Sequence, residues 1–151
     1  MTHKEINILL VDDNRKFLAS AAERAKIKGF NVFTAENGKA ALEIAKDTPI
    51  HVAVVDHQMP DMEGLVVITK LKEIDPDIHT LLLTGHGDEK LREATQALNS
   101  HYFEKEEMNK FWSFIRRNLQ SLEKHMAAAG MATGGDIEDA LEIESPRERK
   151  R

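Results

Sequence analysis

The amino-acid sequence predicts an α/β fold, a five-stranded parallel, doubly wound (βα)5 sheet, on three observations. Five short apolar runs recur along the chain, and segments with helical spacing of apolar residues lie between them. Pro49, Pro60 and Pro76 all fall between these elements, where proline is tolerated. Strands and helices that alternate on this scale are joined by right-handed crossovers, which place helices on both faces of a parallel sheet.

The five apolar runs differ in a way that orders the sheet. They cover residues 6–11, 31–34, 51–55, 79–83 and 101–103. The first, third and fourth are nearly continuous, as strands are when both of their faces are covered. The second and fifth are shorter and more polar, as is typical of edge strands. With the first run in the centre and the third and fourth beside it, we expect the strand order 2-1-3-4-5.

Four helical segments follow the first four runs, and each has one apolar stripe. Asp13 or Asn14 is expected to cap the first helix, Asn37 the second and Asp88 the fourth. The stripes are Phe17, Leu18, Ala21, Ala22 and Ala25; Ala41, Leu42, Ile44 and Ala45; Leu65, Ile68, Leu71 and Ile74; and Leu91, Ala94, Thr95 and Leu98. The spacing predicts that each helix buries one face against the sheet.

The last helix is expected to be extended. Its apolar residues are Met108, Trp112, Ile115, Leu119, Leu122 and Met126, and Phe111 and Phe114 widen the stripe. One interpretation is a docking helix whose first turns pack on the sheet. The other is that Leu119, Leu122 and Met126 form a seam for a homodimer, although the run is shorter than the sustained heptads of a coiled coil.

The composition shifts after this helix, so we expect residues 1–126 to form the domain and residues 127–151 a linker and tail. Alanine and glycine come first, an acidic stretch follows, and the basic residues Arg147, Arg149, Lys150 and Arg151 end the chain. Such a segment is either flexible or docks on the domain or a partner, and it is too short for an independent output domain.

Composition excludes several classes of function. The chain of 151 residues has no cysteine, which excludes a disulfide scaffold, a Cys-based zinc site and a thiol nucleophile. No apolar run approaches the ~18 residues of a membrane span, and the N-terminus lacks a signal peptide's apolar core, so we expect a cytoplasmic protein. The net charge of -5 argues against DNA binding as the main task, and the basic end alone is a weak signal for it.

Polar residues stop the apolar runs. Asp12 and Asp13 follow the first run, Asp56 the third and Thr84 the fourth, and Lys105 lies two residues past the fifth. The carboxyl ends of parallel strands share one edge of a sheet, where ligands bind. Each residue alone has an ordinary interpretation as a helix cap, a turn former or a solvated side chain. Together, at four strand ends, they predict a site.

Three carboxylates at one place repel one another. At ~4 Å and an effective dielectric of 20, each like-charged pair costs on the order of 4 kcal/mol. A divalent cation relieves this repulsion, and an all-oxygen ligand set selects Mg²⁺, or Mn²⁺ in its place. Because Mg²⁺ often completes its shell with phosphate oxygens, the pattern points to phosphoryl chemistry with Asp56 as the candidate nucleophile. Lys105 and Thr84 would contact the phosphoryl group.

The sequence resembles a receiver domain of the response-regulator family of two-component signalling, from about residue 6 to residue 121. The motifs that carry the resemblance are Val11-Asp12-Asp13-Asn14, Asp56-His57-Gln58-Met59-Pro60-Asp61-Met62-Glu63-Gly64, Thr84-Gly85-His86 and Tyr102-Phe103-Glu104-Lys105. In one departure, Glu106 follows Lys105 where receivers usually place a proline, often through a cis bond. We therefore expect either a trans bond with an altered loop or a strained bond.

The resemblance implies that Asp56 accepts a phosphoryl group from a histidine kinase or a phosphotransfer protein. It implies that Asp13, Asp56 and the backbone carbonyl of Gln58 bind Mg²⁺ directly, with Asp12 acting largely through water. Lys105 would contact the phosphate, and the small Gly85 would leave room for it.

The resemblance further implies that Thr84 and Tyr102 form a switch pair, in which the hydroxyl moves toward the phosphate and the ring turns inward behind it. The fourth helix, fifth strand and fifth helix would carry the signal to a downstream protein target. A phosphoryl group would then act by shifting the population of two conformations.

We expect a stand-alone, phosphorylation-dependent receiver that catalyses only its own phosphorylation and dephosphorylation. The alternative is a phosphorylation-independent interaction module on the same fold, which the missing proline and the tail motivate. A nucleotide- or flavin-binding enzyme is poorly supported, because Gly85-His86-Gly87 lacks a third glycine and no Walker-type loop is present.

Overall fold

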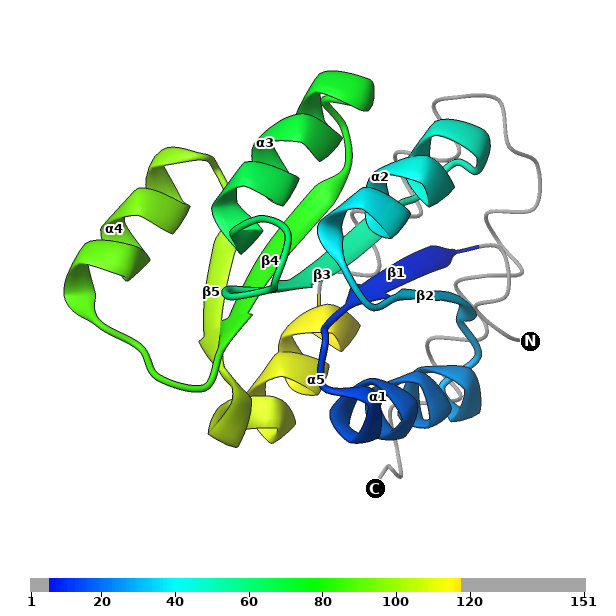
Figure 1. Ribbon diagram of the computed structural model, residues 1–151. Coiled ribbons are helices and arrows are strands. Elements are labelled where there is room, and N and C mark those ends of the chain that lie inside the picture. The colour runs from blue at the N-terminus through cyan, green and yellow to red at the C-terminus, as the bar shows by residue number, and fades with distance from the viewer. Residues whose placement is uncertain (1–5, 118–151) are drawn as a thin grey trace.

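The computed structural model describes residues 6–117, which form one parallel sheet with the strand order β2-β1-β3-β4-β5 (Figure 1). This confirms the predicted fold. The strands are β1 (Asn7–Val11), β2 (Asn31–Ala35), β3 (Val52–Asp56), β4 (His79–Thr84) and β5 (His101–Glu104). The helices are α1 (Arg15–Ile27), α2 (Gly38–Asp47), α3 (Gly64–Ile74), α4 (Glu89–Ala97) and α5 (Met108–Arg117), and a 3-10 turn (Lys105–Glu107) precedes α5.

The sheet has a hydrophobic layer on each face. One layer contains Ile8, Leu10 and Val54 of the strands together with residues of α1 and α5. The other contains Leu9 and Val55 with residues of α2, α3 and α4. Figure 1 shows the same division, with α1 and α5 on one side of the sheet and α2, α3 and α4 on the other. Alternate residues of the central strands therefore point into two separate cores.

The helix caps follow the sequence. Asn14 accepts a hydrogen bond from the backbone N–H of Phe17 at 3.1 Å, which selects Asn14 rather than Asp13 as the cap of α1. Asn37 caps α2 at 2.8 Å, and Asp88 caps α4 at 2.7 Å. Each side chain satisfies a backbone N–H that has no partner inside its own helix.

The first turns of α5 pack on the sheet, as expected of a docking helix. Phe111, Trp112 and Ile115 are buried in the layer shared with α1. The proposed seam at Leu119, Leu122 and Met126, and the predicted linker and tail at 127–151, lie outside the described residues. Among the helices of residues 6–117, none combines the length and apolar character that a membrane crossing requires.

Asp61 ties the loop between β3 and α3 to the start of α2. Its two carboxylate oxygens accept hydrogen bonds from the backbone N–H groups of Gly38 at 3.0 Å and Lys39 at 2.9 Å. These bonds lower the pKa of Asp61 below its ordinary value. The negative charge also lies at the positive end of the α2 dipole. The loop between β3 and α3 is thus attached at Asp61 to the start of α2.

Replacing Asp61 should destabilise the fold in a pH-dependent way. Because the pKa of Asp61 is lowered in the folded state, its contribution is present above the ordinary carboxyl pKa and is lost as the pH falls through the lowered value. We expect Asp61→Ala to cost about 1 kcal/mol at neutral pH, as lost caps do, and less in acid. Urea denaturation at neutral pH and in acid measures the change in the free energy of unfolding. Asp47→Ala, at the opposite end of α2, should cost nothing, because a carboxylate there opposes the dipole.

Candidate functional site

Three aspartates meet at the carboxyl edge of the sheet. Val11 of β1 pairs with Val55 of β3, so Asp12 and Asp13 leave β1 beside Asp56 at the end of β3. One carboxylate oxygen from each lies within 4.8 Å of the others. Asp12 and Asp56 are 2% and 8% exposed, whereas Asp13 is exposed. The predicted convergence of the strand ends is therefore present.

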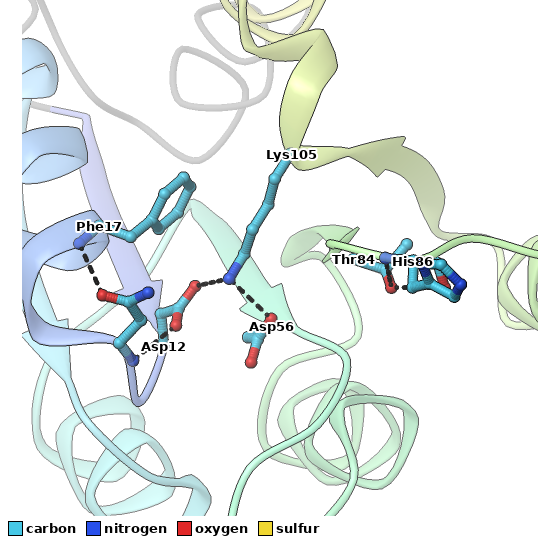
Figure 2. A network of polar contacts seen from close by, with 7 residues as sticks. Asp12, Phe17, Asp56, Thr84, His86 and Lys105 are labelled. Carbon is cyan, nitrogen blue, oxygen red and sulfur yellow. Dashed lines mark hydrogen bonds and ion pairs between the residues drawn. The ribbon is translucent and has the colours of Figure 1, made fainter.

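Lys105 places its ammonium group between two of these carboxylates. Its Nζ lies 2.7 Å from Oδ2 of Asp12 and 3.2 Å from Oδ1 of Asp56 (Figure 2). The lysine opens the 3-10 turn, which the side chains of Glu104 and Glu107 stabilise as a capping box. No peptide bond within residues 6–117 is cis. The bond from Lys105 to Glu106 is thus trans, and the altered loop still delivers the ammonium group to the acids.

The electrostatics of the cluster follow from burial and crowding. Burial and the neighbouring Asp12 carboxylate raise the pKa of Asp56 to about 6, and Lys105 offsets part of this effect. Burial also acts on Lys105 and favours its neutral form, but the ion pairs with Asp12 and Asp56 outweigh burial and raise the pKa of Lys105. One ammonium group therefore compensates only part of the negative charge at this edge.

The acidic cluster has the donors that a hard divalent cation requires. Asp12, Asp13 and Asp56 form the group of potential metal ligands found among the described residues, and all of its donors are oxygens. Partly uncompensated carboxylates at such spacing favour a small divalent ion over transition metals that prefer nitrogen or sulfur. Gln58 lies nearby and lines the same cleft as Asp56. The residues present thus fit Mg²⁺.

Thr84 and Gly85 form the other wall of this cleft. Residues lining it are Asp56, His57, Gln58, Thr84, Gly85, His86 and Asp88. The Thr84 hydroxyl donates to the backbone oxygen of His86 and accepts from its N–H, both at 3.1 Å. Figure 2 shows this pair set apart from the lysine and its two aspartates. A Cβ atom added at Gly85 would meet no atom within 4 Å apart from its two chain neighbours, so the space next to this glycine is open.

Tyr102 of β5 already points into the protein. It is 8% exposed, and burial, followed by the Glu104 carboxylate, raises the pKa of its hydroxyl. The guanidinium carbon of Arg92 lies 4.4 Å from the centre of the ring. A Cβ atom at Gly87 would collide with the Tyr102 hydroxyl, so this glycine makes room for the ring. Sequence reasoning missed Arg92 and Gly87, because no motif marks either of them.

Most of the chain matches a known family. The family model described as the response regulator receiver domain matches residues 8–111. The chain belongs to this family. It is 30% identical over 87 residues to the transcriptional regulatory protein GlrR of Escherichia coli (strain K12), an alignment that covers 58% of this chain and 20% of that protein. The receiver thus spans a fifth of the length of this curated relative.

Solved structures show the same receiver fold. A CheY-like receiver domain protein of Methanospirillum hungatei JF-1 aligns with a TM-score of 0.74 and 23% identity, over 80% of this chain and 98% of that one. A response regulator of Burkholderia pseudomallei, solved with a phosphorylated aspartic acid, a calcium ion and citrate, aligns with a TM-score of 0.63 and 28% identity. That alignment covers 66% of this chain and 59% of the other.

The close approach of α3 to Asp56 predicts that an alanine is tolerated at Gly85 but not at Gly64. Gly64 donates a hydrogen bond to the backbone oxygen of His57 at 2.7 Å, and a Cβ there would collide with the backbone oxygen of Asp56. Gly64→Ala should therefore destabilise the domain by about 1–3 kcal/mol, as overpacking does. Gly85→Ala is the matched control, because open space surrounds Gly85 and the change should stay within about 0.5 kcal/mol. Equal losses in urea denaturation would contradict this account.

Removing one charge from the cluster should stabilise the metal-free protein. Folding raises the pKa of Asp56 to about 6. The free energy of unfolding therefore falls as the pH rises from the ordinary carboxyl pKa through 6, because the folded state must then hold a carboxylate that it disfavours. We expect Asp56→Asn to gain about 1–3 kcal/mol at alkaline pH, and the gain to shrink in acid. Denaturation in a metal chelator measures it. Glu43→Gln, an exposed carboxylate on α2, should show no such gain.

Proposed function

We propose that this chain is a phosphoacceptor receiver in which Asp56 takes a phosphoryl group from a histidine kinase or a phosphotransfer protein. The observation that carries the proposal is the bridge from Lys105 to both Asp12 and Asp56, of which Asp56 also lines an open cleft. A carboxylate oxygen of Asp56 would attack phosphorus as the bond to the donor breaks, giving an acyl phosphate. The phosphorylated aspartic acid in the Burkholderia pseudomallei relative supports this role.

The residues of the cluster take separate roles in this proposal. Asp13, Asp56 and the backbone carbonyl of Gln58 would hold Mg²⁺, or Mn²⁺ in its place, and Asp12 would act through water. The ion would supply positive charge that neutralises the phosphoryl oxygens. Lys105, which contacts both Asp12 and Asp56, would supply the second positive charge. The calcium ion in the Burkholderia pseudomallei relative supports a divalent cation here.

The switch would act through Thr84. Its hydroxyl is engaged with the backbone of His86, so it must leave both hydrogen bonds to reach a phosphoryl oxygen. The open space at Gly85 would admit that oxygen. Because Tyr102 already points inward under Arg92, the phosphoryl group would stabilise this position of the ring rather than create it.

The signal would leave through α4, β5 and α5, where a downstream protein target binds. A homodimer through α5 and a cytoplasmic protein that turns over no metabolite complete the proposal, and DNA binding is no part of it.

One observation favours the alternative, a phosphorylation-independent interaction module on the receiver fold. Tyr102 is buried and stacked against Arg92, a contact that does not involve Asp56, so one switch residue of the output face is held independently of the acceptor site. This module would bind its partner equally well with or without a functional Asp56. The two proposals therefore differ in a single measurable property.

Phosphorylation with a small phosphodonor and Mg²⁺ tests the main proposal. The native chain should gain the mass of one phosphoryl group, and Asp56→Ala should gain none, because the attacking oxygen is absent. Glu43→Gln should behave as the native chain does, since it removes an exposed carboxylate that does not line the cleft. Intact-mass spectrometry measures the gain. An unchanged native mass under several donors would leave only the phosphorylation-independent module.

A further inference from the structure

We propose that Phe17 is a positioning residue that holds the Lys105 ammonium group against the acidic cluster. The inference rests on the proposed function, because that function gives Lys105 its contact with the phosphoryl group. Nζ of Lys105 lies 4.5 Å from the centre of the Phe17 ring, within the range of a cation–π contact. Figure 2 shows the ring on one side of the lysine chain and Asp56 on the other.

The position of Phe17 is itself fixed by the same edge of the sheet. Its backbone N–H donates to the cap Asn14 at 3.1 Å, and the N–H of Asn14 donates to Oδ1 of Asp12 at 2.8 Å. Oδ2 of Asp12 then meets Lys105. The contacts thus form a closed circuit through Asp12, Asn14, Phe17 and Lys105.

The ring would restrict a lysine side chain that can otherwise adopt many conformations. A lysine side chain has many rotamers, and 23% of the Lys105 side chain is exposed, so water competes for its ammonium group. The capping box that holds the turn of Lys105 is formed by Glu104 and Glu107 and does not involve the lysine side chain. Phe17, half-buried against the α1 and α5 layer, presents a rigid negative face that restricts the ammonium group to the side of the acids.

The contact predicts an electrostatic dependence that mere packing does not. Fluorine atoms withdraw charge from the ring face and change its size little, so they weaken the attraction for a cation while the hydrophobic contact remains. Mono-, di- and trifluorinated phenylalanine placed at position 17 of the full chain therefore form a graded series. The same residues at Phe33 of β2 are the matched control, because Phe33 is also half-buried but packs in the other layer.

Two measurements test the inference. The first is the upfield ring-current shift of the Lys105 ε-methylene protons in the phosphate-free protein, which should be present in the native chain and lost in Phe17→Leu. The second is the rate of phosphorylation by a small phosphodonor at saturating Mg²⁺. This rate should fall stepwise with each fluorine, by about threefold to tenfold over the series. Phe17→Tyr should retain both properties, and the Phe33 series should stay flat.

The outcomes separate this inference from the proposed function. If the native chain is phosphorylated and the Phe17 series is flat, Phe17 does not position Lys105. An absent ring-current shift in the native chain also overturns the inference, whatever the phosphorylation result. If the native chain takes no phosphoryl group, the proposed function fails, and the shift, which should shrink along the fluorinated series, still decides whether the ring holds the lysine.

Discussion

The repulsion among Asp12, Asp13 and Asp56 is the constraint around which this edge of the protein is organised. Parallel pairing of β1 and β3 brings their carboxylates together regardless of charge, because the register of the strands is set by the apolar layers beneath. Lys105 relieves part of the repulsion by meeting two of the acids at once. The part that remains favours a divalent cation at this edge, which the proposed phosphoryl transfer would use.

The rest of the fold keeps this unfavourable cluster in place. Two hydrophobic layers fix the central strands from both sides, so their ends have little freedom to move apart. The loop after Asp56 is fixed in its second half, by the hydrogen bonds from the start of α2 to Asp61 and by the tight approach of Gly64 to the backbone of Asp56. Stability elsewhere in the domain thus compensates for charge crowding where the chemistry is proposed.

The two sides of the cleft differ in how firmly they are held. On one side, Lys105 lies between the ring of Phe17 and the carboxylates, and every contact of that circuit is already made. On the other side, the Thr84 hydroxyl forms both of its hydrogen bonds with the backbone of His86, and Tyr102 is buried under Arg92. In the proposed switch, the Thr84 hydroxyl would be the group that changes its hydrogen-bond partners.

The sequence by itself determined the elements, the caps and the edge at which the acids meet. These depend on short-range rules: apolar periodicity, the side chains that satisfy a helix terminus, and the shared direction of parallel strands. Local rules left Asp13 and Asn14 equal as caps, and only the hydrogen bond to Phe17 separates them. They also treated Phe17 as a core residue of its stripe.

Only the tertiary structure decided that the ring of Phe17 meets Lys105, that Gly87 admits Tyr102 and that Arg92 covers it. Each of these contacts joins side chains from different elements, and its existence depends on the exact packing of helices on the sheet. No periodicity or motif predicts such packing, because it forms only when the helices pack on both faces of the sheet.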